Sequence, residues 1–370
     1  MRGIDSITFT ITKDEIVTSL LPENGKYFNV PDLIAYADKV NTFGKALVMR
    51  DDSGTLLSYI LYYDNAAQVF ITMVWTNSNF RGKGYAATLL KHLIASTNKD
   101  ILLEVHPENP AKLLYHKLNF KFERLNGTNE ILKFVKFIAI NQPYIFPYLG
   151  YFQLIYSADS FVFYDDVNFI KQGWINRNKI LVGGEAMLFT VPLQNQSSFT
   201  TIMDTKINKA LYAKWCNKFI KTLAQNYKNA PFYEPVSEMV FAVLNSEHVF
   251  ISDLAIDSVV KVFSYLGIDC KIERASQLPQ GFKDLERSNR LIAIAKSMGY
   301  SNYINPIGGQ ELYKKEFFEE NGVTLSFLSP SITNYKQFEA DFVPGLSIID
   351  VLMFNSKKEV LQMMSGYNII

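Results

Sequence analysis

A short basic segment that carries two glycines, residues 79–86, constrains the N-terminal half of this 370-residue chain most strongly. It follows an apolar run and opens an amphipathic helical pattern, so it is predicted to join a strand to a helix. Gly82 and Gly84 allow the backbone to turn tightly there. The free N–H groups of a helix start favour a negatively charged ligand, and Arg81 and Lys83 add positive charge. The segment therefore indicates a diphosphate-binding turn, with a plain tight turn as the alternative.

The sequence on either side of this turn predicts an α/β domain. Downstream, apolar residues over 86–94 recur at helical spacing, which predicts a helix with one face on a sheet. A second helix is predicted to start after Asn109, with Pro110 near its first turn. The predicted strands are residues 46–51, 56–63, 69–75, 101–106, 121–125 and 130–134.

The motifs in this half resemble those of the GNAT acyltransferases. The spacing Arg81-x-x-Gly84-x-Ala86 resembles the family's coenzyme A loop, and Leu103-Glu104-Val105 with Tyr115 resembles the second half of its motif. The resemblance covers about residues 5–134. It implies a mixed, mostly antiparallel sheet with helices on both faces, and acetyl-CoA as the cofactor. The residues it implies in coenzyme A binding are Val74, Arg81, Gly82, Lys83, Gly84, Tyr85, Ala86 and Asn109.

The same resemblance implies catalytic roles for two residues. Glu104 matches the family's base, which takes a proton from the acceptor amine, and a solvated strand carboxylate is the alternative. Tyr115 stands at the position of the general acid that faces the thiolate leaving group. Backbone amides near residues 73–75 would polarise the thioester carbonyl, as an oxyanion hole does. Asn109 would contact the cofactor, with helix capping as a competing role.

From residue 135 onward the sequence predicts a second α/β domain. An apolar run at 134–140, a proline-bearing loop, an apolar helix and a run at 160–165 that ends in two acids predict a strand–helix–strand start. Helices and short strands alternate after it, which favours a mainly parallel, Rossmann-like sheet, with a further strand over residues 185–192. Ligands bind beyond the carboxyl ends of such strands.

Four blocks of this second half, at residues 141–152, 174–178, 303–313 and 342–350, resemble the WbqC-like family. The similarity spans about residues 136–362 in the expected order. Members of that family often sit among bacterial genes for O-antigen and surface polysaccharides, so the resemblance implies a sugar context.

Polar residues of the second half form a candidate ligand site. Arg177 can hold a phosphate through two parallel hydrogen bonds, and a salt bridge to Asp165 or Asp166 is the alternative. Trp174 offers a flat face for a sugar or a base, with core packing as the alternative. Asp350 follows an apolar, strand-like run and lies either in a cleft or in a buried cap. The candidates are Gln142, Tyr144, Tyr148, Asp165, Asp166, Lys171, Trp174, Asn176, Arg177, Asn178, Asn305, Gly308, Gly309 and Tyr313.

Composition restricts the partners and the location. A formal net charge of +1 gives no electrostatic footprint for nucleic acid. Cys216 and Cys270 make no disulfide or metal framework and suit a reducing cytoplasm, and no metal site is predicted. Residues 1–11 lack the apolar core of a signal peptide, and no apolar run approaches membrane-spanning length. We therefore expect a cytoplasmic protein without a membrane partner, and we leave homodimerisation open.

Together these features predict a GNAT domain over residues 1–134 joined to a WbqC-like domain over residues 135–370. The expected activity is acetylation of an amine on a nucleotide-linked amino sugar, or on an amino acid attached to that sugar, in O-antigen and surface-polysaccharide biosynthesis. In the bifunctional version, the second domain adds an amino acid such as glycine. The alternative is a protein or small-amine N-acetyltransferase whose second domain binds the target. A degenerate GNAT scaffold is disfavoured by the intact Gly82, Gly84, Ala86 and Tyr115.

Overall fold

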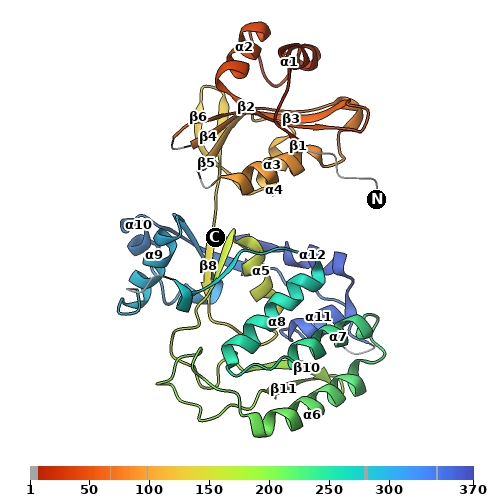
Figure 1. Cartoon of the computed structure of the whole chain (residues 1–370), viewed down its shortest axis with the longest axis vertical. Helices are drawn as coiled ribbons and strands as arrows, with labels where there is room; N and C mark the ends of the chain where they lie inside the picture. The colour runs from red at the N-terminus through yellow and green to blue at the C-terminus, as the bar shows by residue number, and fades with distance from the viewer. Residues whose placement is uncertain (1–6, 67, 98, 279–281, 339–340) are drawn as a thin grey trace. The chain divides into compact units, whose positions relative to one another are not determined.

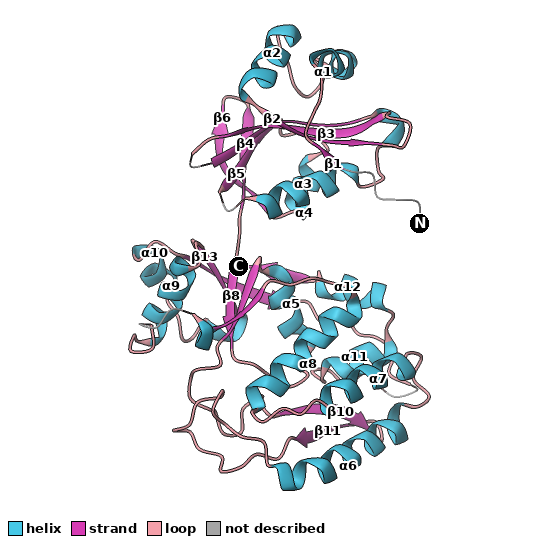
Figure 2. Ribbon diagram, in the orientation of Figure 1, coloured by secondary structure: helices cyan, strands magenta, loops and turns pink. Residues whose placement is uncertain are grey.

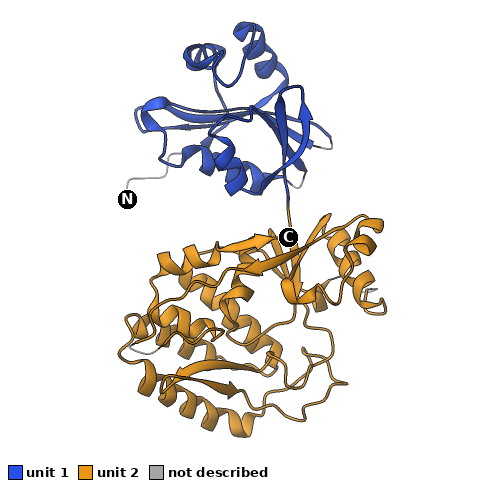
Figure 3. Ribbon diagram, turned by 180° about the vertical axis from the view of Figure 1, so that it is seen from behind, with its two compact units in different colours: residues 1–135 blue, residues 136–370 orange. Residues whose placement is uncertain are grey.

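The computed structural model describes residues 7–66, 68–97, 99–278, 282–338 and 341–370. It divides into two compact units, Met1–Val135 and Lys136–Ile370 (Figure 3). Both units combine helices with a β-sheet, which confirms the predicted α/β class (Figure 2). No helix in the described ranges has the length and apolar character needed to cross a membrane. Residues 1–6, which belong to the segment expected to lack the apolar core of a signal peptide, lie outside the described residues.

The first unit is built on a sheet whose described strands follow the order β1-β2-β3-β4-β5-β7-β6. Neighbouring strands are antiparallel except β4 and β5, which run parallel. This mixed, mostly antiparallel sheet confirms the fold expected for the N-terminal half. The strands are β1 (Ile7–Thr8), β2 (Lys45–Arg50), β3 (Leu56–Asp64), β4 (Gln68–Thr76), β5 (Asp100–Val105), β6 (Phe120–Asn126) and β7 (Asn129–Phe134).

Helices cover both faces of this sheet because its strands carry apolar residues on both sides. Along β2, Ala46 and Val48 belong to a buried cluster with α1 (Lys13–Leu20) and α2 (Leu33–Phe43). Leu47 and Met49 belong to a second buried cluster, which includes residues of α3 (Tyr85–Ser96) and α4 (Lys112–Lys117). Figure 1 shows the two pairs of helices on opposite faces of the sheet.

The second unit contains a mainly parallel sheet in the order β12-β9-β8-β13-β14-β15, counted over the described strands. Only β15 pairs antiparallel within it, so the predicted Rossmann-like character is confirmed. The strands are β8 (Ile138–Asn141), β9 (Ser160–Phe163), β12 (Ile272–Arg274), β13 (Asn302–Pro306), β14 (Thr324–Pro330) and β15 (Tyr367–Ile369). Strand β8 begins at Ile138 and not at residue 134, where the apolar run of the sequence starts, because Phe134 belongs to β7 of the first unit.

The helices of the second unit connect these strands. The predicted strand–helix–strand start is confirmed, since α5 joins β8 to its parallel neighbour β9. The helices are α5 (Leu149–Ser157), α6 (Lys209–Tyr227), α7 (Tyr233–Leu244), α8 (Ile251–Leu266), α9 (Arg287–Ser297), α10 (Lys315–Glu320), α11 (Ile348–Phe354) and α12 (Lys357–Met364).

The further strand predicted over residues 185–192 is present, and it belongs to a separate hairpin. Strand β11 (Glu185–Thr190) pairs antiparallel with β10 (Arg177–Val182) in a sheet of their own. Gly183 and Gly184 connect them, with φ of 60° and 85°. A two-residue hairpin turn with positive φ at both positions is the geometry that adjacent glycines favour. The hairpin packs on α6 through the rings of Phe189 and Phe219, whose centroids lie 4.6 Å apart.

Asp350 lies in helix α11, so the strand-like interpretation of this apolar run was wrong. The residues around it are buried on every side, and a fully apolar run does not distinguish a strand from a helix. The carboxylate accepts hydrogen bonds from Tyr227, Tyr335 and Gln337 at 2.6–2.7 Å. Burial raises the pKa of Asp350 above its usual range. This residue therefore belongs to a buried polar network rather than to an open cleft.

Candidate active site

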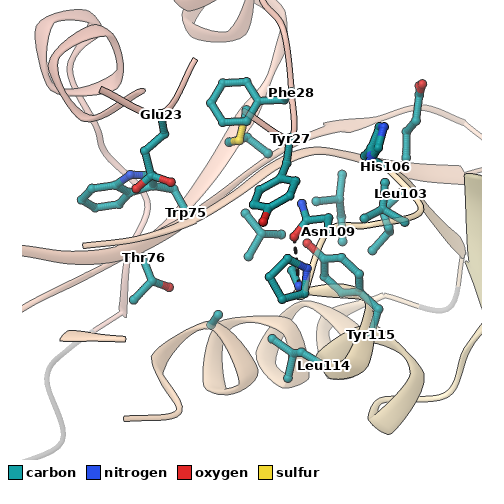
Figure 4. A pocket seen from close by; sticks show the side chains of 18 of the residues that line it. Glu23, Tyr27, Phe28, Trp75, Thr76, Leu103, His106, Asn109, Leu114 and Tyr115 are labelled. Carbon is teal, nitrogen blue, oxygen red and sulfur yellow. Dashed lines mark hydrogen bonds between the residues drawn. The ribbon is translucent and has the colours of Figure 1, made fainter. Parts of the chain in front are cut away.

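The candidate active site of the first unit forms where β4 and β5 separate. Their parallel pairing covers residues 68–71 of β4 and 100–103 of β5. The register between β3 and β4 shifts at Thr72, which has no paired residue on β3 and so forms a β-bulge. Beyond this point the two strands line a cavity of about 640 Å³ (Figure 4).

Past the separation, one edge of β4 has no partner among the described strands. Residues 73–76 of β4 pair with β3 on one side, whereas the partnership with β5 ends at Ile71. Backbone groups on the other side are then available to a ligand, because backbone N–H and C=O groups need hydrogen-bond partners. Val74 lies in this segment and lines the cavity. The geometry agrees with the expected role of these amides in binding a carbonyl oxygen.

The glycine-bearing turn lies at the same cavity. Gly82 and Gly84 adopt φ of 76° and 87°, and Gly84 immediately precedes α3. Arg81, Gly82 and Ala86 line the cavity, and the Lys83 ammonium lies 4.8 Å from the ring centroid of Phe80. A Cβ built on either glycine meets no heavy atom within 4 Å, so space is open around the turn. An open, positively charged helix start fits a diphosphate group.

Glu104 lies on β5 with its exposed side chain at the cavity. Its Oε1 accepts a hydrogen bond from Asn129 Nδ2 at 2.8 Å, and its Oε2 accepts one from Asn126 Nδ2 at 3.1 Å. Both neighbours come from the β6–β7 hairpin. The carboxylate is therefore held by two side chains, although the sequence analysis considered it only as a base or as a solvated group.

Tyr115 lies on α4, is buried, and lines the same cavity. Its ring packs edge-on against Phe120 at 6.0 Å between centroids. Burial raises the pKa of its phenol well above the usual value, so the hydroxyl stays protonated and able to donate. Asn109 lines the cavity too, while its Oδ1 accepts a hydrogen bond from Ala111 N at 2.9 Å (Figure 4). This hydrogen bond closes a turn just before α4, whose N-cap residue is Ala111, so Asn109 does not cap the helix itself.

The side chains of four further residues, to which the sequence analysis gave no role in the site, also line the cavity. Tyr27 and Phe28, which follow the short helix η1 (Leu21–Glu23), lie at the cavity with Trp75 (Figure 4). The Trp75 ring stacks on Tyr59 with ring centroids 5.2 Å apart. Trp75 Nε1 is buried and has no hydrogen-bond partner among the described residues. Glu23 forms an ion pair with Arg81. No local pattern indicates these residues, because tertiary contacts alone bring them to the turn and to β4.

In the second unit, polar residues gather at the carboxyl ends of β8 and β13. In the strand order, β9 lies on one side of β8 and β13 lies on the other. The winding of the sheet therefore reverses between β8 and β13. Ligands of open α/β sheets bind in the crevice at such a reversal. Gln142 follows β8, and Asn305 lies near the end of β13.

The turn after β13 is tightly packed around a glycine. A Cβ on Gly309 would lie 2.4 Å from Asn305 Oδ1 and 3.4 Å from the ring of Tyr313, so any larger residue would require the buried Asn305 side chain to move. Asn305 is buried and donates to the Tyr303 hydroxyl at 2.6 Å, whereas Gly308 is exposed. This arrangement brings together Asn305, Gly309 and Tyr313, which are three of the candidates for a ligand site.

The two acids after β9 have partners other than Arg177. Asp165 is buried and accepts from the backbone N–H and the hydroxyl of Ser276 at 3.0 and 2.8 Å. Burial raises the pKa of Asp165 above its usual range. Asp166 pairs with the buried Arg290 at 2.6 Å. The alternative of a salt bridge from Arg177 to either acid is therefore wrong.

Arg177 and Trp174 form a surface group at the start of β10. The Arg177 guanidinium donates to the carbonyls of Gly173 and Gln172. Its Cζ and the Lys179 Nζ each lie 5.8 Å from the Trp174 ring centroid. Trp174 is 41% exposed, so the core-packing alternative is wrong.

The remaining candidates are divided between the surface and the interior. Lys171 is exposed. Asn176 and Asn178 are buried and donate to the carbonyls of Val191 and Phe146 at 2.9 and 2.7 Å, so both brace the chain. Tyr144 packs on Tyr151 at 5.4 Å, and burial raises its pKa to about 12. Tyr148 directly precedes α5, where its ring packs against Gly150.

Comparison with known protein families identifies two matches in the chain. Residues 14–120 match the acetyltransferase (GNAT) family, and residues 142–362 match the WbqC-like protein family. The second match spans more than half of the chain. Both families that the motifs had indicated are therefore confirmed. One curated relative, the uncharacterized protein Rv1507c of Mycobacterium tuberculosis, is 27% identical over 226 residues, which cover 60% of this chain and 94% of that protein.

Solved structures similar to this chain include two acetyltransferases. One is the PaiA N-acetyltransferase of Thermoplasma acidophilum in complex with coenzyme A, with 18% identity, a TM-score of 0.28, and coverage of 35% of this chain and 98% of that chain. The other is the ribosomal-protein-S18-alanine N-acetyltransferase of Escherichia coli, with 15% identity, a TM-score of 0.29, and coverage of 35% of this chain and 91% of that chain.

Proposed function

Because the chain belongs to the WbqC-like protein family and carries an acetyltransferase (GNAT) domain ahead of that match, we propose that it is an acetyl-CoA-dependent N-acetyltransferase. Its acceptor is the amine of a nucleotide-linked amino sugar, or of an amino acid attached to that sugar. The observation that carries the proposal is a single cavity of about 640 Å³ that is lined by the glycine-bearing turn, Glu104 and Tyr115.

The turn and the free edge of β4 hold the acyl donor. Acetyl-CoA supplies the acetyl group as an activated thioester. The N–H groups at the start of α3, with Arg81 and Lys83, bind the diphosphate, because the helix dipole and both side chains are positive there. Amides of residues 73–75 donate to the thioester carbonyl oxygen and stabilise the negative charge that develops on it during attack.

Glu104 and Tyr115 move the two protons of the reaction. Glu104 accepts a proton from the acceptor ammonium, so that the neutral amine attacks the carbonyl carbon. A carbon–nitrogen bond forms, and the carbon–sulfur bond breaks as the Tyr115 hydroxyl gives its proton to the departing thiolate. The second proton that the nitrogen loses returns through solvent to the Tyr115 phenolate and restores the hydroxyl. The carboxylates of Glu23 and Glu104 and the rings of Tyr27, Phe28 and Trp75 suit a cationic amine carried on a bulky group.

The second domain binds the sugar nucleotide or adds an amino acid such as glycine to its amine. The switch point between β8 and β13, with Asn305 and Gly309, supports a ligand site there. Joining two sites in one chain raises the effective concentration of an intermediate that both use. A role in O-antigen biosynthesis follows from this substrate class.

Mass spectrometry of the purified chain with acetyl-CoA and a panel of amino-sugar nucleotides tests this function. The panel is run with and without glycine and ATP. We expect a product that gains one acetyl group, or an acetyl and a glycyl group together. Acetylation of peptides or small amines with no modification of any sugar nucleotide would instead identify a protein or small-amine acetyltransferase.

Replacing Tyr115 with phenylalanine should lower kcat by about 10²-fold, because the thiolate loses its proton donor. The Kd for coenzyme A should stay unchanged, since the ring and its packing against Phe120 remain. Stopped-flow kinetics and calorimetry measure the two quantities. Because burial raises the pKa of Tyr115, its proton remains available through neutral and mildly alkaline pH. A loss of binding without a loss of turnover would make Tyr115 a packing residue only.

Replacing Glu23 with glutamine should tighten coenzyme A binding several-fold. Arg81 is engaged by Glu23, and the cofactor's diphosphate has to compete with that carboxylate for the guanidinium. Glutamine keeps the size of the side chain and removes its charge. Calorimetric titration with coenzyme A measures the change, and Glu108→Gln serves as a control because the exposed Glu108 does not line the cavity. An unchanged or weaker affinity would show that the ion pair does not compete with the ligand.

A further inference from the structure

The hairpin between β6 and β7 presents two asparagines to the cavity side of the sheet. β6 ends at Asn126 and β7 begins at Asn129, and these two residues are Cα partners at the end of the ladder. Gly127 and Thr128 make the turn between them, with φ of 61° at Gly127. Neither asparagine occupies a central turn position, so the turn geometry does not require either of them.

Both asparagines reach the same carboxylate. On the sheet, Glu104 pairs with Ile131, and Asn129 lies two residues before Ile131, so Asn129 is a diagonal neighbour on the same face. Asn129 Nδ2 donates to Oε1 of Glu104 at 2.8 Å, and Asn126 Nδ2 donates to Oε2 at 3.1 Å. Each carboxylate oxygen is therefore fixed by one amide.

Neutral donors suit a carboxylate that has to receive a proton. No lysine, arginine or histidine among the described residues forms a salt bridge with Glu104. A cation in contact would oppose the approach of an ammonium group, whereas an amide does not. An ionised carboxylate offers about four acceptor positions, so two amide bonds leave room for the acceptor amine. The two bonds also restrict a side chain that would otherwise rotate freely on an exposed strand.

We infer that Asn126 and Asn129 are positioning residues, which hold the Glu104 carboxylate oriented to take the proton of the acceptor amine. This inference rests on the proposed function, in which Glu104 is the base. The asparagines act through Glu104 and contribute nothing once that base is removed. The β6–β7 hairpin then has a part in the reaction although it carries no group that transfers a proton.

A double-mutant cycle tests the inference. Asn129→Leu and Asn126→Leu, alone and together, should lower kcat/KM by roughly tenfold to a hundredfold, because a misplaced base transfers protons poorly. In a Glu104→Gln chain the same substitutions should lower kcat/KM no further. Asn129→Asp, which is nearly isosteric, should move the acidic limb of the pH–rate profile to higher pH, since a second carboxylate disfavours ionisation of the first. Calorimetry with coenzyme A should show an unchanged Kd in every variant.

The outcomes separate this inference from the proposed function. If Glu104→Gln has wild-type activity, then Glu104 is not the base and the proposed mechanism fails. If Glu104→Gln is impaired but the asparagine variants are fully active, the positioning role alone is wrong. The same holds if the asparagine substitutions lower kcat/KM by the same factor in the Glu104→Gln chain and in the wild type. If the leucine variants lose coenzyme A binding, Asn129→Asp decides the matter, and an unmoved acidic limb there contradicts the inference.

Discussion

Replacing Glu104 with glutamine is expected to lower kcat/KM for acetyl transfer by about 10²-fold or more, because the acceptor ammonium then loses the carboxylate that takes its proton. Glutamine keeps the length of the side chain and still accepts a hydrogen bond from Asn129, so the hairpin should stay in place. The acidic limb of the pH–rate profile should also flatten, because the group that must ionise is gone. Steady-state kinetics over a range of pH measure both effects.

The matched control for this substitution is Glu108→Gln. Glu108 is an exposed acid in the loop after β5 and does not line the cavity, so its replacement should leave the rate and the pH profile unchanged. A Glu104→Gln variant that keeps the wild-type profile would remove Glu104 from the mechanism. The Kd for coenzyme A should be the same in all three proteins, because Glu104 lies on β5 and not at the diphosphate turn.

Replacing Gly84 with valine is expected to abolish coenzyme A binding. Gly84 adopts φ of 87° directly before α3, a conformation that a β-branched residue adopts only with strain of about 1–3 kcal/mol. The new side chain would also project into the open space where the diphosphate is expected. Calorimetric titration with coenzyme A should therefore give no measurable heat of binding.

Gly54→Val is the matched control, because it separates backbone strain from loss of the ligand site. Gly54 has φ of 83° and equally open surroundings, and it lies in the turn between β2 and β3, outside the residues that line the cavity. Thermal unfolding should show a similar loss of stability in both variants, and only Gly84→Val should lose binding. Wild-type affinity in Gly84→Val would contradict the assignment of the turn.

Strand and turn patterns predicted the framework of the first unit well. The strand predicted over residues 130–134 is β7 (Asn129–Phe134), because turn residues and alternating apolar residues determine its ends. Helix α1 was missed, although a signal was present. Thr12 and Glu15 form a capping box at its start, with Thr12 N and Glu15 Oε2 2.8 Å apart.

The second unit shows where local patterns are insufficient. The Gly183-Gly184 pair is a hairpin signal that would have separated β10 and β11 from the main sheet. The burial of Asp350 depends on Tyr227, Tyr335 and Gln337, and no local pattern brings Tyr227 to α11. The partners of Asp165 and Asp166 lie 111 and 124 residues further along the chain. Such pairings follow from the tertiary fold and not from spacing in the sequence.

The candidate active site was predictable to the extent that its residues lie within motifs. The turn at residues 81–86, Glu104 and Tyr115 were indicated by their spacing. The structure places Arg81, Gly82 and Ala86 of the turn at one cavity with Glu104 and Tyr115. The wall formed by Tyr27, Phe28 and Trp75 was not predicted, because loops and strand faces carry no motif of their own. The asparagines that hold Glu104 were also missed, since their role depends on the pairing of β5 with β7.

The account depends on the binding of a coenzyme diphosphate by the main chain at the start of α3, and a crystal structure of the full chain soaked with coenzyme A tests this most directly. We predict phosphate oxygens within about 3.2 Å of backbone nitrogens in residues 82–86. Electron density for the coenzyme at a different place, or a turn that stays empty at saturating coenzyme A, would contradict the central claim.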